Sequence, residues 1–509
     1  MTLQKTAESI ASGNINLRLN YATIDDIIRR AISLSEPHFR DITEKDYAET
    51  YRAIYGKNIF EGKVVVVRSD LNSPVEYKNG GYHIVGKSRI RESVPTIKEL
   101  SGYGAKVVVI AHQGTAGKID CISLEPHKKA LEEFLKKEII FRRAHWYGTA
   151  TEEIITQNMK NGDIFLSDNL RKLSDETSDL RDPNQFSSLP DSYMTTLERL
   201  ADFYVNDAFS TSHRWHGSII GFQHLLNIAG RLTEKEIENN KKLIVNLKRP
   251  YTLLLGGVKI LEYLEFIEDS LENKLVDNVL AAGVLGIIAV LGTKTNGHLI
   301  DLGKKTEEFI KEKGLYPLRR KVRGLAKNEE RFIVPVDFKV DLHGEACYMT
   351  PEEISMHLRK DDIGIYGLGP KTVALFSRKL EDSKTIYIKG SPTKDDDERF
   401  LTEARELIDK TVTLKRESGV ITILSGGDTN NLVSRFGYNP KADFTYFTLA
   451  GGASTEYLAG NLLPGILMLN TSYNAFWSLP LENGLPEGYN LGFQLIAPKI
   501  QDNLKPFRR

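Results

Sequence analysis

The stretch VVVVRSDLN at residues 64–72, followed by PTIKELSGYG at 95–104 and KVVVIAH at 106–112, decides the fold class of this chain. Each apolar run has the length of a buried strand, and the helix-like segment lies between the two runs. Strands that alternate with helices are typical of a parallel sheet covered on both faces. Ligands bind such sheets at the carboxyl ends of the strands, so the polar residues after each run are the candidates for function.

The same alternation continues along the chain in two halves. Further strand-like runs are DIFLSD (163–168), DFYVND (202–207), YTLLLGG (251–257), GIIAVLG (286–292), RFIVPVDFKV (331–340), DIGIYGLGP (362–370), TIYIKG (385–390), GVITILSGG (419–427) and DFTYFTLAGG (443–452). Between the halves, residues 231–250 form one charged helical pattern that ends at Pro250. We therefore predict an α/β protein with two doubly wound parallel-sheet domains joined by a hinge helix.

The first 57 residues differ from the rest and predict a helical N-terminal extension. Thr23 precedes apolar residues at helical spacing, and a second such pattern ends at Gly56. This extension packs on the main body or makes a dimer or partner contact, and we take a monomer as the default state. The predicted domains are 1–57 (helical extension), 58–230 (first α/β domain, with the 471–509 tail as a candidate addition), 231–250 (interdomain helix) and 251–470 (second α/β domain).

Composition excludes several classes of protein. Among 509 residues, 68 Lys and Arg balance 68 Asp and Glu, whereas proteins that bind nucleic-acid backbones usually carry a basic excess. The two cysteines, Cys121 and Cys347, are too few for a disulfide framework or a zinc site made by cysteines alone. The apolar run at 279–292 is shorter than the roughly 20 residues of a membrane span, and the N-terminus lacks a signal-peptide core. We predict a cytoplasmic protein without nucleic-acid or membrane partners.

Glycine-rich loops between strands and helices in the second half suggest phosphate binding. They are YGLGPKT (366–372), LSGGDTNNLVSRFG (424–437) and LAGGASTEYLAG (449–460). Glycine lets a ligand approach the backbone, and a helix N-terminus offers N–H groups and a positive dipole end. None matches a named nucleotide motif, because Pro370 stands where a Walker A loop needs lysine. Lys259 follows another strand and two glycines, so it is either an ordinary surface lysine or a phosphate contact.

Charged and polar residues follow the strands of the first half as well. They include Asp70 and Asn72 in RSDLN, His112, and the segments DNLR (168–171) and NDAFSTSHR (206–214). Together with Arg89 and Arg91, they would form a pocket for a small anion that carries hydroxyl groups, since arginine binds carboxylate and phosphate with two hydrogen bonds. Each Asp or Asn could instead cap a helix. His213 and His216 have metal-ligand spacing, but with no third ligand nearby we predict no metal site there.

These segments, in this order, resemble the phosphoglycerate kinase family, and its archaeal branch most closely. The segments that carry the resemblance are VRSDLNSP, RIRESVPTI, GAKVVVIAHQG, DNLR, NDAFSTSHR, GGVKI, GLGPKT, SGGDT and AGGASTEYLAG with NLLPG. They run from about residue 60 to about residue 470, across both halves. The resemblance implies a cytoplasmic glycolytic enzyme that transfers a phosphoryl group between ATP and the carboxylate of 3-phosphoglycerate, with Mg²⁺.

The resemblance also implies roles for individual residues. The phosphoglycerate set is Asp70, Asn72, Arg89, His112, Arg171 and Arg214. The nucleotide set is Lys259, Asp396, Gly426, Gly427, Asp428 and Thr429, with Asp428 as the magnesium contact, and Arg89 and Lys259 are the catalytic residues. The nucleophile is already ionised, so no general base is needed, and catalysis rests on positioning, charge stabilisation and domain closure.

Several positions depart from the family pattern. They are Thr115 for an arginine that helps to hold substrate, Lys172 for an aromatic residue, Tyr263 for a second lysine, Lys389–Pro392 for Asn-Gly-Pro and Ala450 for a glycine. Two alternatives therefore stay open beside an active phosphoglycerate kinase. Thr115 would suit a paralogous kinase for another small carboxylate, and the extension with the altered 389–392 loop would suit a weakly active binding or scaffold protein.

Overall fold

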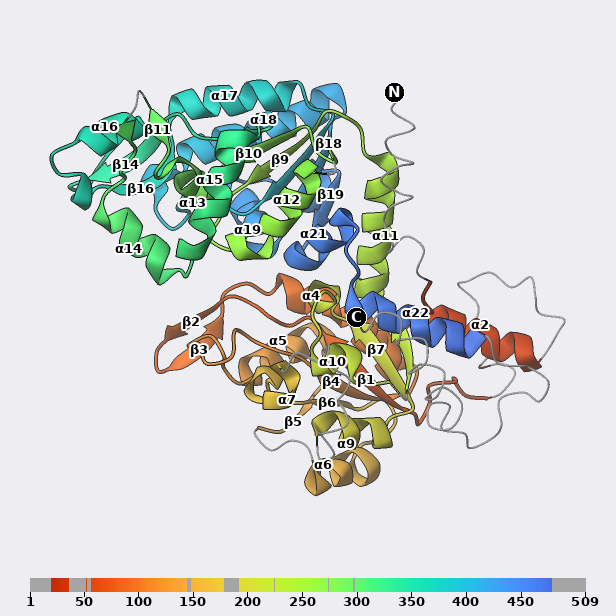
Figure 1. The fold of residues 1–509 in the computed structure, drawn as a ribbon. Helices are drawn as coiled ribbons and strands as arrows, with labels where there is room; N and C mark the ends of the chain where they lie inside the picture. The colour runs from red at the N-terminus through yellow and green to blue at the C-terminus, as the bar shows by residue number, and fades with distance from the viewer. Residues whose placement is uncertain are drawn as a thin grey trace. The chain divides into compact units, whose positions relative to one another are not determined.

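The computed structural model describes residues 20–35, 52, 56–143, 148–177, 192–223, 225–272, 274–295 and 298–477. The chain divides into two compact units (Figure 1), which we call the N-terminal unit, residues 15–238 and 462–509, and the C-terminal unit, which includes residues 239–461. The predicted second helix of the extension, apart from residue 52, and the tail beyond residue 477 lie outside the described residues.

The N-terminal unit is built on a six-stranded parallel sheet in the order β5-β6-β4-β1-β7-β8. Its strands are β1 (Val64–Ser69), β4 (Lys106–Ile110), β5 (Ile140–Phe141), β6 (Ile164–Leu166), β7 (Phe203–Asp207) and β8 (Leu226–Ala229). Strands β4, β5 and β6 lie on one side of β1, and the later strands β7 and β8 lie on its other side. The strand order therefore reverses beside β1. Ligands bind at such a reversal in open parallel sheets.

Alternation within the strands explains why this sheet is buried on both faces. In β1, Val65 and Val67 belong to one apolar core, while Val66 belongs to another. Val108 of β4 lies in the same core as Val66, as expected when successive side chains point to opposite faces. Helices α4 (Ser88–Gly102), α5 (Glu125–Leu135) and α9 (Tyr193–Leu200) belong to the same unit.

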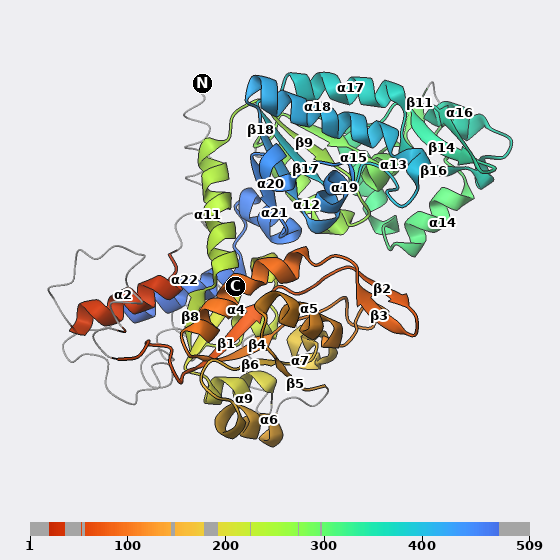
Figure 2. The same ribbon diagram turned by 180° about the vertical axis from the view of Figure 1, so that it is seen from behind.

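Segments from both ends of the described chain complete the N-terminal unit. Helix α2 (Ile24–Ser35) lies beside α22 (Pro464–Trp477), as Figures 1 and 2 show, and Asn20 N donates to Asn470 Oδ1 over 2.9 Å. Residue Thr23 makes a parallel bridge with Ala229 of β8. The described part of the predicted extension therefore packs on the main body, and the dimer-contact alternative for residues 1–57 stays a prediction.

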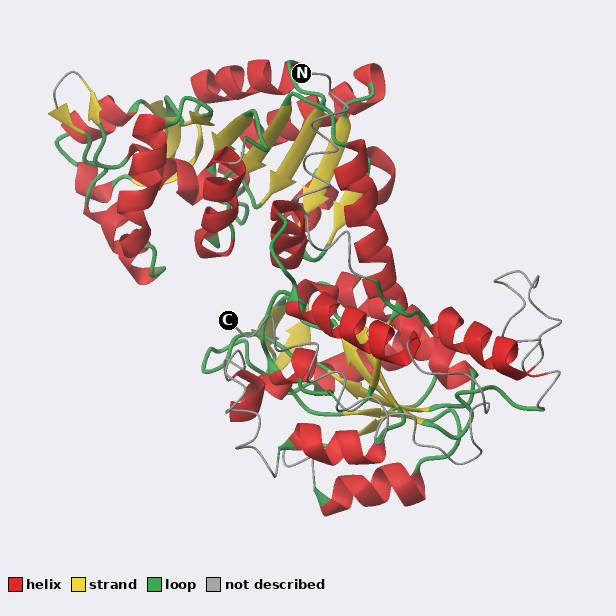
Figure 3. Ribbon diagram, turned by 45° about the vertical axis from the view of Figure 1, so that its right-hand side comes forward, coloured by secondary structure: helices red, strands yellow, loops and turns green. Residues whose placement is uncertain are grey.

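The C-terminal unit has a second parallel sheet, which is drawn among the yellow strands of Figure 3. It has six strands in the order β13-β10-β9-β17-β18-β19. Its strands are β9 (Tyr251–Leu255), β10 (Asn278–Ala281), β13 (Phe332–Ile333), β17 (Thr385–Lys389), β18 (Ile421–Ser425) and β19 (Tyr446–Thr448). The strand order reverses between β9 and β17. The predicted fold class, two doubly wound parallel sheets, is confirmed, while the exact domain boundaries stay a prediction.

In the second half, one strand prediction is wrong and another run contains two separate strands. The run GIIAVLG (286–292) lies mostly in helix α13 (Gly283–Val290), whose apolar side chains are all buried. The run RFIVPVDFKV splits between β13 and β14 (Phe338–Leu342), and β14 forms an antiparallel three-stranded sheet with β15 (Glu345–Met349) and β16 (Gly364–Leu368). A short run in which almost every residue is apolar fits a buried helix as well as a buried strand.

Helix α11 (Arg231–Asn246) carries the chain from one unit to the other, between Glu238 and Asn239. Its N-terminus is fixed by Asp207 at the end of β7, whose Oδ1 accepts a hydrogen bond from Leu232 N over 2.8 Å. Arg231 donates to Asp25 of α2 and to Glu99 of α4 over 2.7–2.9 Å. In the described part of the chain, no helix has the length and apolar character needed to cross a bilayer.

Candidate functional sites at the strand ends

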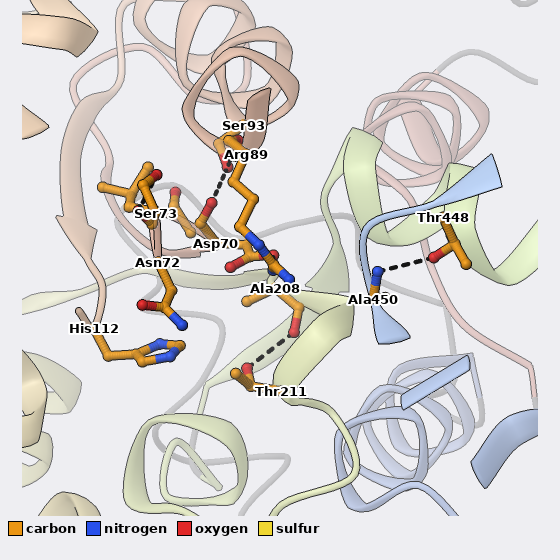
Figure 4. A network of polar contacts seen from close by, with 12 residues as sticks. Asp70, Asn72, Ser73, Arg89, Ser93, His112, Ala208, Thr211, Thr448 and Ala450 are labelled. Atoms are coloured by element: carbon orange, nitrogen blue, oxygen red, sulfur yellow. Dashed lines mark hydrogen bonds and ion pairs between the residues drawn. The ribbon is translucent and has the colours of Figure 1, made fainter. Parts of the chain in front are cut away.

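The ends of β1 and β4 bring four of the predicted residues together in the N-terminal unit. Asp70 follows β1 directly, and Arg89 in the first turn of α4 makes an ion pair with its Oδ2 (Figure 4). Asn72 Oδ1 accepts a hydrogen bond from Gly114 N over 2.9 Å, which ties the loop after β1 to the loop after β4. His112 lies two residues beyond β4 and is buried.

The charges of four arginines converge on His112. Burial lowers the pKa of His112 well below its usual value, and the nearby charges of Arg68, Arg171, Arg214 and Arg89 lower it further, in that order. Burial, followed by the charges of Arg214 and Arg68, lowers the pKa of Arg171 to about 10. After burial, the neighbouring guanidinium charges are the main causes of both shifts, so this edge of the sheet carries several positive charges.

The buried polar atoms at this edge that lack a partner among the described residues include Asp70 Oδ1 and Arg171 Nε. Buried polar atoms are normally hydrogen-bonded, and an exception in a native structure calls for an explanation such as a ligand. One atom is an acceptor beside an arginine, and the other is a guanidinium donor. Together they fit a ligand that has both an anionic group and a hydroxyl group.

Arg68 is absent from the predicted site residues, yet it is the largest fully buried side chain in the structure's described part. It lies near the end of the apolar run of β1, and its guanidinium contacts Ser218 Oγ, the Ser69 carbonyl and His112 Nδ1 over 2.7–2.9 Å. One signal in the sequence could have identified Arg68, namely that it is an arginine within an otherwise apolar strand. A buried charge of this kind requires its own set of polar partners.

In the C-terminal unit, the ends of β9 and β18 bring Lys259 and Asp428 together. Lys259 Nζ lies 3.2 Å from Asp428 Oδ2, and both side chains are 61% exposed. Asp428 lies in the first turn of α19 (Gly427–Arg435), which begins directly after Gly426. Gly426 has a φ of 93°, a conformation that glycine adopts without strain. A Cβ atom at Gly427 would meet no atom within 4 Å, so the helix start is open to a ligand.

Two other predicted nucleotide residues differ in their surroundings. The hydroxyl group of Thr429 accepts a hydrogen bond from Gly390 N over 2.7 Å and donates to the Ser425 carbonyl over 2.8 Å. Its side chain therefore joins β17, β18 and α19, which leaves only its backbone N–H for a ligand. Asp396 is exposed, and its Oδ1 lies 3.7 Å from Lys394 Nζ.

The loop at 366–372 does not offer a free helix N-terminus. Asp337 accepts hydrogen bonds from Lys371 N and Thr372 N, over 3.0 and 2.7 Å, at the start of α17 (Pro370–Glu381). A Cβ atom at Gly369 would lie 2.2 Å from Asp337 Cγ, so this glycine makes room for the carboxylate of the protein itself. The prediction that all three glycine-rich loops face phosphate is therefore wrong for this loop.

The departures from the family pattern have defined environments. Lys389 at the end of β17 is 6% exposed; its Nζ lies 3.0 Å from Thr455 Oγ1 and 5.2 Å from the centre of the Tyr263 ring. The Tyr263 hydroxyl donates to the Gly256 carbonyl over 2.8 Å. An ammonium group is thus present beside Tyr263, but it belongs to Lys389 at the end of β17 and not to a lysine at position 263.

The other substituted positions are held by local hydrogen bonds. Lys172 pairs with Asp168 over 2.9 Å, and Asp120 Oδ1 accepts from Thr115 N over 3.1 Å. Ala450 N donates to Thr448 Oγ1 over 2.9 Å (Figure 4). Among the residues with described positions, no three His, Cys, Asp or Glu side chains gather into a metal site.

Comparisons with known proteins agree on one family. The family model described as phosphoglycerate kinase matches residues 57–461. The phosphoglycerate kinase of Methanococcus maripaludis is 32% identical, over 81% of this chain and 96% of its own length. That of Dictyoglomus turgidum is 34% identical, over 80% and 96% respectively.

Solved structures show the same relationship. The crystal structure of phosphoglycerate kinase from Pyrococcus horikoshii OT3 matches with a TM-score of 0.69 and 29% identity, over 82% of this chain and 98% of that one. The structure of phosphoglycerate kinase from Coxiella burnetii, at 23% identity and a TM-score of 0.56, shares the fold.

Proposed function

The chain belongs to the phosphoglycerate kinase family, and we propose that its two sets of strand-end residues bind the two substrates, 3-phosphoglycerate in the N-terminal unit and ATP in the C-terminal unit. The predicted reaction class, phosphoryl transfer to a carboxylate, is confirmed by this membership. The roles of the individual residues belong to our proposal.

One observation carries the phosphoglycerate assignment: the arginine charges converge on His112 beside two buried polar atoms without a described partner. In our proposal, Arg89, Arg171 and Arg214 bind the phosphate and carboxylate of 3-phosphoglycerate. Asp70 Oδ1 accepts a hydrogen bond from the substrate hydroxyl group, and Asn72 and His112 complete the set. The neutral Asn72 and the negative Asp70 confer orientation, whereas the arginines confer affinity.

The open start of α19 supports the nucleotide assignment. The first N–H groups of a helix have no partner within the helix, and the dipole favours negative charge there. Gly426, Gly427 and the Thr429 N–H are proposed to face the ATP phosphates, with Lys259 on the phosphate that is transferred. Asp396 is proposed to contact the ribose, because it is exposed in the loop after β17.

Asp428 suits the magnesium ion that the family uses. Mg²⁺ binds in enzymes through one or two carboxylates together with substrate phosphates and water, and Asp428 is an exposed carboxylate at the phosphate-facing helix start. In our proposal Asp428 leaves Lys259 when nucleotide binds and holds the ion, which would neutralise phosphate charge there. Lys259 then becomes available to the transferred phosphate.

The reaction needs no proton acceptor, because the attacking carboxylate or phosphate oxygen is already ionised. Catalysis is proposed to come from alignment and from positive charge on the transferred group, supplied by Arg89 and Lys259. The two bound groups must meet for transfer, and α11, through which the chain passes from one unit to the other, is the proposed hinge.

A coupled assay with ATP, Mg²⁺ and 3-phosphoglycerate tests these roles. We expect turnover in the wild type and a loss of at least about a hundredfold in kcat for Lys259→Ala, because one contact to developing charge is removed. Lys311→Ala is the matched control, since Lys311 is an exposed lysine on α14 (Lys304–Glu312). Equal rates for Lys259→Ala and the wild type would refute the assignment of Lys259.

A further inference from the structure

Arg68 holds His112 from behind the proposed phosphoglycerate set. Arg68 is fully buried near the end of β1, and its Nη2 lies 2.9 Å from His112 Nδ1. The other guanidinium nitrogens are also engaged: Nε donates to Ser218 Oγ over 2.8 Å, and Nη1 donates to the Ser69 carbonyl over 2.7 Å. With all three nitrogens bonded, Arg68 has a fixed position relative to the histidine ring.

This contact determines which ring nitrogen carries hydrogen. A guanidinium group has only donors, so His112 Nδ1 must be the acceptor and must be free of hydrogen. A neutral imidazole carries one N–H, which therefore lies on Nε2. A second proton would place an N–H of His112 against an N–H of Arg68, so the contact also disfavours the imidazolium form.

A buried carboxylate stabilises this arrangement from the other side. Ser218, which accepts from Arg68, donates its hydroxyl hydrogen to Glu176 Oε1 over 2.8 Å. Glu176 Oε2 accepts from Ser218 N over 2.8 Å and from the Tyr193 hydroxyl over 2.7 Å. Glu176 is fully buried, so its charge balances that of Arg68 inside the protein. Glu176, Ser218, Arg68 and His112 thus form one continuous polar chain.

We propose that Arg68 is a positioning residue that keeps His112 in the neutral form protonated at Nε2, so that His112 donates a hydrogen bond to the bound phosphoglycerate. This proposal rests on the proposed function, since it takes His112 to be part of the substrate set. It separates two tasks among the arginines: Arg89, Arg171 and Arg214 contact the anion, whereas Arg68 contacts only protein groups.

The surroundings of His112 agree with a histidine that does not titrate in the working range. The charged groups that act on it are Arg68, Arg171, Arg214 and Arg89, and together with burial they hold its pKa well below the usual value. An ordinary histidine would change charge near about pH 6.5 and would make substrate affinity depend on that change. A lowered pKa instead favours the neutral donor over a wider pH range.

Nuclear magnetic resonance of the imidazole nitrogens in the full-length enzyme tests the proposal directly. With ¹⁵N-labelled histidine, we expect His112 to show an unprotonated Nδ1 and a protonated Nε2, constant from about pH 5.5 to 8.5. Spectra of His112→Gln identify the signal among the 11 histidines. A proton on Nδ1, or a titration between about pH 6 and 7.5, would overturn the proposal without any further variant.

Substitution of Arg68 adds a kinetic readout. For Arg68→Met we expect the His112 signal to be mixed or to titrate. We also expect the KM for 3-phosphoglycerate to rise about tenfold or more, because one hydrogen bond to a charged ligand is weakened. The KM for ATP should stay unchanged. Arg68→Lys keeps a donor and should restore part of the effect. If Arg68→Met does not fold, Ser218→Ala, which removes the hydroxyl between Arg68 and Glu176, gives the same measurements.

The proposed substrate site and the proposed role of Arg68 can fail separately. If Arg171→Ala leaves the KM for 3-phosphoglycerate unchanged, the proposed function of this edge is wrong. If Arg171→Ala raises that KM but His112 keeps its Nε2 proton in Arg68→Met, the substrate site stands and the role of Arg68 is wrong.

Discussion

At the residue scale, Thr115 lies next to a cluster of arginines and adds no charge to it. The neighbouring Gly114 carbonyl lies 3.5 Å from Arg171 Nη1, so an arginine at position 115 would begin close to the proposed anion site. Asp120, whose Oδ1 accepts from Thr115 N, would compete for that arginine. The gain from one more cation should therefore be smaller than a full contact to a charged group provides.

For Thr115→Arg we expect the KM for 3-phosphoglycerate to fall by about three- to tenfold, which is less than one full charged hydrogen bond of about 1.5–3 kcal/mol would give. The KM for ATP should stay unchanged. Thr115→Gln has similar reach without the charge and serves as control. An unchanged KM in Thr115→Arg would indicate that another group already replaces the arginine, and Lys172 would be the next residue to substitute.

The residues proposed to contact substrate could be identified from the sequence, whereas the contacts of the proposed supporting residue Arg68 could not. Asp70, His112 and Lys259 follow strands, and the position of strand ends in a parallel sheet is a general rule. Arg68 contacts protein groups that come from positions 69, 112 and 218. No spacing in the sequence indicates that these positions meet, because the meeting depends on which strands are neighbours and on the course of the loops.

At the element scale, two helix starts that follow glycine-rich loops differ in what surrounds them. The start of α17 is capped by Asp337, and the start of α19 has open space at Gly427. The sequence could not separate them, because Asp337 lies more than thirty positions before the residues that it caps. Likewise, the run at 286–292 fits a strand in the sequence because a fully buried helix has no polar face to reveal its period.

Gly427→Ala should separate ligand approach from folding. The new Cβ atom meets no protein atom within 4 Å, so the free energy of unfolding should change by less than about 0.5 kcal/mol. The same methyl group would fill the approach of the ATP phosphates, and we expect the KM for ATP to rise about tenfold or more. Steady-state kinetics for both substrates test this, and an unchanged KM for ATP would contradict the assignment of α19.

Asp207, which accepts a hydrogen bond at the start of α11, has a carboxyl group with a raised pKa. Burial raises the pKa of Asp207 to about 8, against the hydrogen bonds that Leu232, Thr96 and Thr233 provide. Between about pH 4 and 8 the folded protein then holds a proton that the unfolded chain has lost. Unfolding releases this proton, so Asp207 lowers the stability progressively as pH rises through that window.

We expect Asp207→Asn, which resembles the protonated acid, to remove this dependence. The slope of unfolding free energy against pH should become less negative by at most about 1.4 kcal/mol per pH unit between about pH 5 and 7. Urea unfolding at several pH values measures it. Glu138→Gln changes an exposed carboxyl group of the same unit and should leave the slope as it is. An identical slope in Asp207→Asn would mean that Asp207 is ionised in the folded protein.

At the scale of the whole molecule, the N-terminal helix is a structural part of the first unit. Ile24, Ile27 and Ile28 of α2 are at most 2% exposed and belong to the same core as β1 and β4. Arg231 connects α2 to the start of α11 through Asp25. The helical spacing of these residues is visible in the sequence, but their partner is not, since the surface that they cover is formed by segments far along the chain.

Ile28→Ala should therefore lower the free energy of unfolding of the N-terminal unit by about 2–4 kcal/mol, as loss of a buried isoleucine usually does. Arg29→Ala, at an exposed position of the same helix, should change it by less than about 0.5 kcal/mol. Tryptophan fluorescence measures the change, because Trp215 packs against the same core as Ile28. An effect of Ile28→Ala below about 1 kcal/mol would mean that α2 is dispensable for folding.

Helix α22 has a consequence for the order of events during protein synthesis. Its residues Leu467 and Met468 belong to the core of the N-terminal unit, and Ser472 Oγ accepts a hydrogen bond from Asn227 N of β8 over 2.8 Å. The ribosome synthesises the chain from its N-terminus to its C-terminus, so β8 is made more than two hundred residues before α22. The nascent first unit therefore exposes apolar surface until α22 has been made, and by then all the strands of the second unit have been made. For this enzyme, the unit that is made first should be the last to reach its final structure.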